Sequence, residues 1–321
     1  MGPILLGILA AFFFAFTFVL NQSMELSGGS WIWSASLRYI FMVPFLLAIV
    51  SARKNLKPLL MNIKHNPIPW FLWSFVGFVL FYAPLTYAAA YSPGWLIAGT
   101  WQVTIISGAL LSPLFYERTL TNQGLVFIRA KIPFKGLGMS VIILAGILLM
   151  QFEHARHIPI EMVMLGVIPV LIASFAYPLG NRKMMEVTSG KLDAYQRVLG
   201  MTLASLPFWL LLALYGLLTE GVPTVNQSFQ SLLVAMTSGV IATVLFFKAT
   251  DLVSGNMQKL AAVEATQSME VLFALAGEFF ILSLPLPSLL SWVGIILIML
   301  GMALHSYSTF RSKKGELKIS A

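Results

Sequence analysis

Ten apolar segments, with positive charge concentrated in every second connection between them, constrain this chain more than any other feature of its sequence. Each segment is long enough to cross about 30 Å of hydrocarbon as a helix. The segments are 3–21, 31–50, 70–90, 95–116, 137–152, 161–181, 195–217, 229–249, 257–282 and 288–307. The pattern predicts an all-α fold: a polytopic integral membrane protein with ten transmembrane helices.

Lysine and arginine gather in the connections that follow even-numbered segments. Four cations follow each of the second, fourth, sixth and tenth segments, and Lys248 and Lys259 flank the connection after the eighth. The sixteen are Arg53, Lys54, Lys57, Lys64, Arg118, Arg129, Lys131, Lys135, Arg182, Lys183, Lys191, Arg197, Arg311, Lys313, Lys314 and Lys318. The opposite connections hold only Arg156. Because cytoplasmic loops of membrane proteins are enriched in Lys and Arg, we expect both termini to be cytoplasmic, in a bacterial plasma membrane.

Composition excludes several other classes of protein. With 58% hydrophobic and 10% charged residues, the chain has too little polar surface to be water-soluble. The net charge of +8 does not indicate a nucleic-acid partner, because the cations lie in short connections beside lipid headgroups. We find no phosphate-binding loop, no intramembrane histidine pair and no Ser-His-Asp set. We therefore expect no enzyme, cofactor or metal, and the sequence indicates no oligomeric state.

The two halves of the chain repeat each other. The run Met24–Gly29 recurs as Met185–Gly190, Arg38 recurs as Arg197, and Met42 recurs as Met201, within offsets of 159 to 161. Five segments per repeat is an odd number, so the second repeat must enter the membrane from the opposite side. Inverted repeats of this kind are typical of secondary transporters, although a duplicated scaffold would leave the same pattern.

This organisation predicts three regions. They are a first five-helix repeat over 1–155, a second, inverted five-helix repeat over 156–308, and a basic cytoplasmic tail over 309–321. Without a nucleotide-binding domain, transport would be driven by an ion gradient or by the gradient of the substrate.

Two kinds of segment make the chain resemble a known family. Arginine stands in the second segment of each repeat, at Arg38 and Arg197, and a glutamate closes the fourth and ninth segments, at Glu117 and Glu278. In these features the chain resembles the ten-helix multidrug resistance efflux transporter family of the drug/metabolite transporter superfamily. The resemblance implies five-plus-five helices, cytoplasmic termini and export of a small molecule.

One departure from that superfamily concerns the proton carrier. Its four-helix relatives carry a proton-exchanging carboxylate midway along their first helix, whereas segment 3–21 has no acid. The ninth segment offers Glu264 and Glu270, with Gln267 between them. A lone carboxylate in hydrocarbon costs several kcal/mol, which favours its protonated form and suits a proton carrier. The two glutamates project some 120° apart on a helix, and either of them could instead pair with an arginine to lock helices together.

Arginines and aromatic residues suggest a substrate cavity. Arg38 lies inside the second segment, where it could bind an anion or a carboxylate gate, or could pack or snorkel structurally. Trp101 and Gln102, opposite Thr86 and Tyr87, offer an aromatic face with hydrogen-bonding groups for flat organic cations. The same aromatic residues are also common in cores and interfacial belts.

Together these features predict a secondary transporter that exports hydrophobic or cationic compounds, coupled to protons through Glu264 or Glu270. Its partners would be a small-molecule substrate and the lipid bilayer. An uncoupled exporter of amino acids or related metabolites is the nearest alternative. A membrane scaffold or sensor that transports nothing is the alternative of another class.

Overall fold

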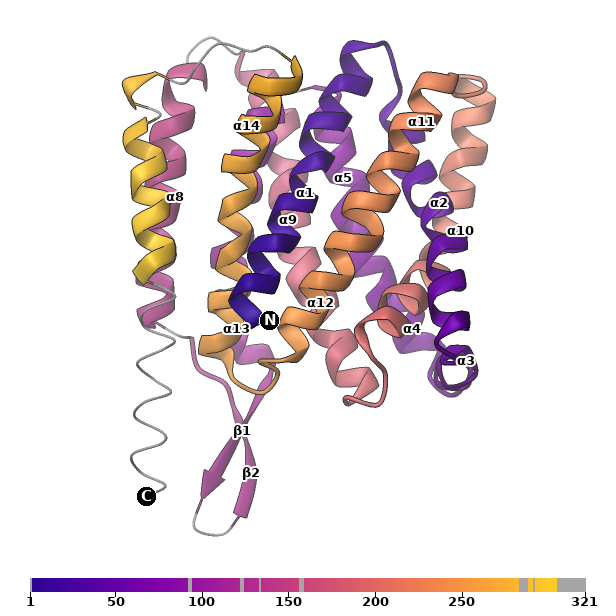
Figure 1. Cartoon of the computed structure of the whole chain (residues 1–321), viewed down its shortest axis with the longest axis vertical. Coiled ribbons are helices and arrows are strands. Elements are labelled where there is room, and N and C mark those ends of the chain that lie inside the picture. The colour runs from indigo at the N-terminus through magenta and orange to yellow at the C-terminus, as the bar shows by residue number, and fades with distance from the viewer. Residues whose placement is uncertain are drawn as a thin grey trace.

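The structure is a computed structural model that describes residues 2–91, 94–121, 124–132, 134–155, 159–282, 288–290 and 292–304. Within these residues the chain is almost entirely helical, and most helices run side by side along the long axis of the molecule (Figure 1). The predicted basic tail 309–321 and Arg156 lie outside the described residues.

Helices of different length make up the bundle, and two contain π-helical stretches. The elements are α1 (Pro3–Leu26), α2 (Trp31–Ala52), α3 (Leu56–His65), α4 (Pro67–Ser74), π-helix η1 (Phe75–Val79), α5 (Leu80–Ala89), α6 (Gly94–Trp101), α7 (Val103–Leu110), 3₁₀-helix η2 (Ser112–Leu114), β1 (Tyr116–Thr121), β2 (Gly124–Arg129), α8 (Phe134–Ala155), α9 (Ile160–Thr188), α10 (Ala194–Thr219), α11 (Val225–Val234), π-helix η3 (Ala235–Ala242), α12 (Thr243–Asp251), α13 (Met257–Glu264), 3₁₀-helix η4 (Ala265–Ser268) and α14 (Met269–Leu282).

Six helical segments are long and apolar enough to cross a membrane. They are Pro3–Leu26, Trp31–Ala52, Pro67–Ala89, Met164–Thr188, Ala194–Thr219 and Val225–Asp251. Three shorter apolar helices cover Ile97–Leu110, Leu137–Leu149 and Trp292–Leu304. The protein is therefore a multi-pass membrane protein, as its hydropathy predicts.

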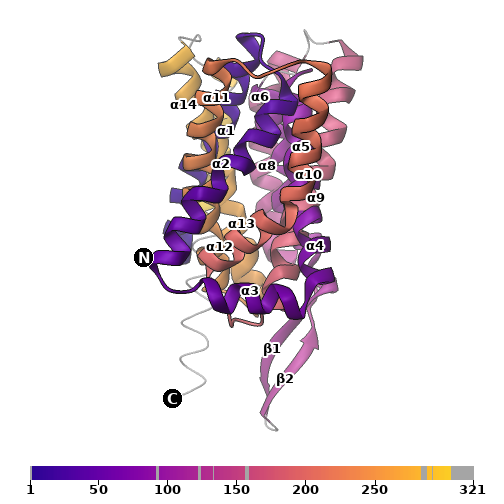
Figure 2. The same ribbon diagram turned by 90° about the vertical axis from the view of Figure 1, so that its right-hand side faces the viewer.

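The connections at one end of the bundle carry more structure than the sequence predicts. The expected all-α fold is confirmed, with one local addition: β1 and β2 pair as an antiparallel hairpin in the region that was expected to be a charged loop. Its strands contain β-branched residues such as Thr119, Val126 and Ile128, which favour extended backbone. The hairpin projects from the end at which α1 begins, and α3 lies across that end (Figure 2). We call this the inner end, because the charge pattern predicts that it faces the cytoplasm, and the opposite one the outer end.

A continuous apolar core holds the main bundle together. Helix α2 packs along α10, α5 packs along α9, and α1 packs against α12, α14 and η3. Tyr39 of α2 stacks on Trp209 of α10 with ring centroids 4.4 Å apart. The α1 helix therefore lies between segments that come from the second half of the chain.

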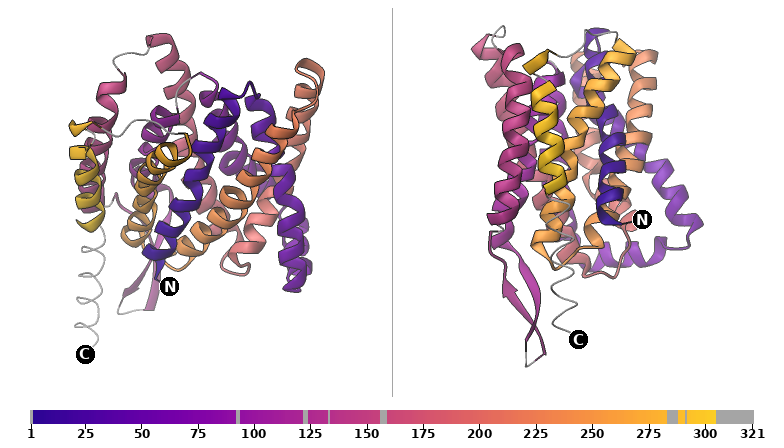
Figure 3. Two further views of the ribbon diagram at one scale, coloured as in Figure 1. Left: turned by 45° about the horizontal axis from the view of Figure 1, so that its top comes forward. Right: turned by 60° about the vertical axis from the view of Figure 1, so that its left-hand side comes forward.

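Helix α8 and the helix Trp292–Leu304 form a pair at one edge of the bundle (Figure 3). Glycines bring them close together: a Cβ atom at Gly146 would lie 2.6 Å from the Gly294 carbonyl oxygen, and Gly301 faces Ile143. Small residues at such contacts let transmembrane helices approach closely.

The two π-helical stretches stand in the middle of the spans Pro67–Ala89 and Val225–Asp251. Each contains a glycine that faces a methionine of another helix. A Cβ atom at Gly77 of η1 would lie 3.0 Å from Cε of Met201, and one at Gly239 of η3 would lie 2.6 Å from Sδ of Met42. Each stretch is therefore fitted closely against its neighbour.

Helices α1 and α9 end in similar ways. Gly28 follows α1 with φ +74°, and Gly190 follows α9 with φ +72°. A left-handed backbone at a helix end favours glycine, because a Cβ atom is strained there. The next helices, α2 and α10, are capped by Ser30 and by a capping box at Asp193.

Candidate functional site

The ninth predicted segment is not one regular helix. Residues 265–268 form the 3₁₀-helix η4, which separates Glu264 at the end of α13 from Glu270 in the first turn of α14. A 3₁₀ turn has 3.0 residues instead of 3.6, so it changes the direction in which later side chains project. The two glutamates consequently meet different surroundings.

Glu264 is bound by an arginine near the inner end. Its carboxylate accepts hydrogen bonds from Nε of Arg182 at 2.9 Å and from Nη2 at 2.6 Å. Both side chains are 2% exposed. Gly108 of α7 lies directly against the pair, where any side chain would collide with the Glu264 carboxylate. Glu264 therefore fits the alternative interpretation, in which a glutamate pairs with an arginine and holds two helices together.

Glu270 lies in a small cavity at the centre of the bundle. The residue is 1% exposed, and its Oε1 atom has no hydrogen-bond partner among the described residues. The indole of Trp101 is within hydrogen-bonding reach of the carboxyl group. The cavity has a volume of about 10 Å³, which is about the space that one water molecule needs. It is lined by Phe14, Thr17, Phe18, Phe81, Leu85, Trp101, Tyr177, Gln267 and Glu270.

Aromatic rings form most of the cavity wall. The ring of Phe81 lies 5.1 Å from that of Trp101 and 4.6 Å from that of Tyr177, measured between centroids. Phe14 meets Tyr177 edge to face at 6.3 Å. These rings come from α1, α5, α6 and α9, so both halves of the chain contribute to the wall. Such a surface suits flat apolar or cationic compounds.

Arg38 lies behind this wall rather than in it. The guanidinium is 3.9 Å from the ring centroid of Tyr82 and 5.9 Å from that of Phe81, and its Nη2 donates to Ser238 Oγ at 2.9 Å. The residue is 1% exposed, so it does not snorkel to a headgroup. Within the described chain no carboxylate pairs with it, and its Nε and Nη1 have no partner.

A second ion pair stands near the inner end. Arg197 of α10 binds Asp251 of α12, and its Nη2 also donates to Oδ1 of Asn181 at 3.4 Å. Asn181 in turn donates to Thr250 at 3.3 Å. Arg197 therefore ties three helices together.

The other predicted site residues differ in where they lie. Gln267 and Trp101 line the Glu270 cavity. Gln102 is buried at the junction of α6 and α7, where it donates to the Ala98 carbonyl at 3.1 Å, and it does not line that cavity. Tyr87 points elsewhere and packs on Trp31, with ring centroids 5.3 Å apart.

Sequence reasoning missed several residues of this site. Arg182 was expected in a cytoplasmic loop, but α9 continues to Thr188 and buries it. Tyr177 and Thr17 were not singled out, although a polar group within an apolar segment is a usable signal. The phenylalanines of the wall have no signal of that kind.

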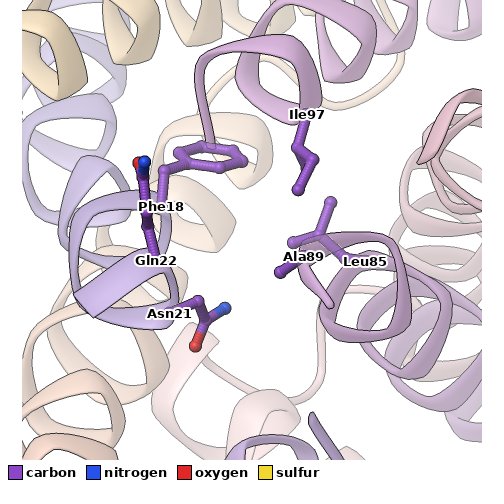
Figure 4. A pocket seen from close by; sticks show the side chains of 6 residues that line it. All are labelled: Phe18, Asn21, Gln22, Leu85, Ala89 and Ile97. Atoms are coloured by element: carbon purple, nitrogen blue, oxygen red, sulfur yellow. The ribbon is translucent and has the colours of Figure 1, made fainter. Parts of the chain in front are cut away.

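A second cavity lies farther along α1. Phe18, Asn21 and Gln22 of α1 face Leu85 and Ala89 of α5 and Ile97 of α6 (Figure 4). Its volume is also about 10 Å³. Phe18 and Leu85 belong to both cavities, so the two are neighbours.

Fold and site together define a multi-pass helical membrane protein with a central carboxylate in an aromatic cavity. Comparison with known families places the chain more closely. Residues 1–311 match the family model described as "EmrE: Putative multidrug resistance efflux transporter", and the chain belongs to this family. The expected family membership is therefore confirmed.

Relatives and a solved structure extend this result. The chain is 60% identical over 309 residues to "Uncharacterized protein YjlA" of Bacillus subtilis (strain 168), covering 96% of this chain and 95% of that protein. It is 52% identical over 270 residues to an "Uncharacterized 42.1 kDa protein in intracellular alkaline protease 3'region" of Shouchella clausii, covering 84% and 70%. A solved structure described as "Crystal structure of protein" has the same fold, with TM-score 0.71 and 13% identity over 96% of this chain and 98% of that one.

Proposed function

We propose that this protein is a secondary transporter of the bacterial plasma membrane that exports hydrophobic or cationic compounds in exchange for protons. We assign the exchange to Glu270. One observation carries the proposal: Glu270 is 1% exposed, lines an aromatic cavity, and has an oxygen atom without a partner among the described residues. A carboxyl group in this position can hold either a proton or a cation, and competition between the two couples their movements.

Glu264 has a different role in this proposal. Its charge is neutralised by Arg182 through two short hydrogen bonds, so it is not available to a proton or a cation. We assign the Arg182–Glu264 pair and the Arg197–Asp251 pair to closure of the inner end. The Glu270 cavity is too small for a drug-sized molecule, so this arrangement corresponds to a closed state that must open to admit substrate.

Ten spans in two inverted five-helix repeats are part of the proposal. The contacts of the π-helical stretches support it: Gly77 of the first half meets Met201 of the second, and Gly239 of the second half meets Met42 of the first. The two glycines are separated by 162 residues and the two methionines by 159, close to the offsets seen in the sequence. Such exchanged contacts are expected when a pseudo-twofold axis relates two halves, an architecture that supports alternating access.

Transport into proteoliposomes tests the assignment of Glu270. A fluorescent organic cation should accumulate under an imposed pH gradient, and Glu270→Gln should abolish that movement because it removes the exchanging group. Glu278→Gln is the matched control, since Glu278 is another α14 carboxylate that is 3% exposed with an unpartnered Oε1 atom but does not line the cavity. Equal loss in both variants, or full activity in Glu270→Gln, would rule out the assignment.

Arg38 favours a second candidate, export of anionic metabolites or amino acids without proton coupling. Its Nε and Nη1 atoms have no partner among the described residues and could bind a carboxylate if the aromatic wall moved. Substrate binding would then change little with pH and would be lost in Arg38→Gln rather than in Glu270→Gln. Binding measured across a panel of amino acids separates the two functions.

A further inference from the structure

One face of α1 is polar from the central cavity to the outer end. Thr17, Asn21, Gln22 and Glu25 follow one another at spacings of four, one and three residues. Spacings of three and four keep helical side chains on one face. Glu25 stands in the last turn of α1. This arrangement is unusual for a transmembrane helix in which 19 of the 20 other residues of Pro3–Leu26 are apolar or glycine.

The second cavity lies beside α1, and two of its lining residues carry unsatisfied polar atoms. Asn21 is 5% exposed, and its Oδ1 atom has no partner among the described residues. The Oε1 atom of Gln22 likewise has none. Leaving a buried polar group unpaired costs about 1–3 kcal/mol. The side chains of Asn21 and Gln22 project from α1 in different directions (Figure 4). The cavity volume of about 10 Å³ is close to what one water molecule needs, and Asn21 is among the residues that line the cavity.

We propose that this face of α1 is the external proton-entry path to Glu270, with a water site beside Asn21. The proposal rests on the proton exchange assigned above to Glu270. The neighbouring cavity repeats the arrangement: the Oε1 atom of Glu270 and the Oη atom of Tyr177 have no partner there, and Thr17 lines it. A proton carried by water at the outer site passes to water in the inner cavity and then to Oε1, which converts the carboxylate to a carboxylic acid.

The two ends of the bundle differ in a way that gives this path its direction. Met24 and Met185 correspond in the two repeats at an offset of 161 residues, and the same offset pairs Asn21 with Arg182. At the inner end, that position holds an arginine bound to Glu264 and closed to water, whereas at the outer end it holds a neutral amide beside a cavity. Among the described residues, the path therefore offers polar, cavity-lining groups at the outer end and a closed ion pair at the inner end.

Thiol labelling can test the path, because the chain has no cysteine of its own. Single cysteines at Asn21, Gln22 and Glu25 would be exposed to a membrane-impermeant sulfonate thiol reagent in right-side-out vesicles. Cysteines at Leu20 and Ser23 are matched controls, since both are half-buried like Gln22 but project to other faces of α1. We expect labelling on the polar face at least about tenfold faster than at the controls, and slow labelling of all five in inverted vesicles.

Equal rates around the helix, or faster labelling from the inner side, would overturn the proposal. Gln22→Cys keeps the test valid if Asn21→Cys fails to fold, because Gln22 is only half-buried whereas Asn21 is buried and donates to Tyr82. The labelling is measured without substrate or a pH gradient, so it can succeed even if proton exchange at Glu270 is disproved. As a functional arm, Gln22→Leu should slow gradient-driven transport at least about tenfold, while Ser23→Ala should leave it unchanged. A Gln22→Leu variant with the wild-type rate would also overturn the proposal.

Discussion

Removing one partner of the Arg182–Glu264 pair should lower the free energy of unfolding by several kcal/mol. Both side chains are 2% exposed and share two hydrogen bonds of 2.9 and 2.6 Å. A hydrogen bond to a charged group contributes about 1.5–3 kcal/mol, so two give roughly 3–6 kcal/mol. This agrees with the roughly 3–5 kcal/mol lost when one half of a buried ion pair is removed. We therefore expect Glu264→Gln to destabilise the protein by about 3–5 kcal/mol.

Unfolding by sodium dodecyl sulfate in mixed micelles, followed by circular dichroism, measures this loss. The control is Glu186→Gln, which breaks the exposed pair with Lys183 on the same helix, a pair with a 2.8 Å separation. Exposed pairs contribute only about 0–1 kcal/mol. In the double variant Arg182→Met with Glu264→Leu, most of the stability should return, because no charge is left buried alone.

Two results would refute this reasoning. A loss in Glu264→Gln no larger than that in Glu186→Gln would mean that water reaches the pair and screens it. The second result concerns the double variant. If it loses as much free energy of unfolding as Arg182→Met and Glu264→Leu lose together, Arg182 and Glu264 do not act as a unit.

Three further predictions concern packing and the second ion pair. Gly108→Ala should destabilise by about 1–3 kcal/mol or more in the same assay, because its methyl group would enter the buried ion pair. Gly180→Ala should lower the free energy of unfolding more than Gly77→Ala. The methyl group added at Gly180 would meet backbone atoms of Gly77, whereas the one added at Gly77 would first meet the flexible end of Met201. Denaturation curves of both variants give the order. Asp251→Asn should cost less than Glu264→Gln, because the Asp251 side chain is 33% exposed while Arg197 is buried; similar midpoints would contradict this ranking.

Hydropathy predicted the multi-pass helical fold because a membrane imposes a simple rule on a sequence. A span must be apolar over its length, so this signal can be read without knowing any contact. The hairpin of β1 and β2 was missed because short polar connections follow no such rule. The position of Arg182 was missed for a related reason: a cation near a predicted span end was assigned to the loop, although its buried partner allows the helix to continue.

Within the candidate site, the sequence supplied candidate residues but not the direction in which their side chains point. Glu264 and Glu270 were both candidates, and only their surroundings distinguish a paired carboxylate from one with an unpartnered oxygen. The 3₁₀ stretch between them is not apparent in residue spacing, so an ideal helix predicts the wrong relative direction. Tyr87 packs on Trp31 and does not line the Glu270 cavity, a direction that residue spacing alone does not give.

The close approach of Gly180 to Gly77 creates a contact point that divides α9 into a long outer arm and a short inner arm. The contact joins backbone to backbone, so a small rotation there disturbs little side-chain packing. Pro178, two residues away, has no amide hydrogen to tie the helix at this point. Gly180 lies 20 residues after Ile160 and 8 before Thr188, which makes the two arms about 30 and 12 Å long at a rise of about 1.5 Å per residue. A rotation that separates the short inner arm by a given distance therefore sweeps the outer arm about two and a half times as far, in the opposite direction.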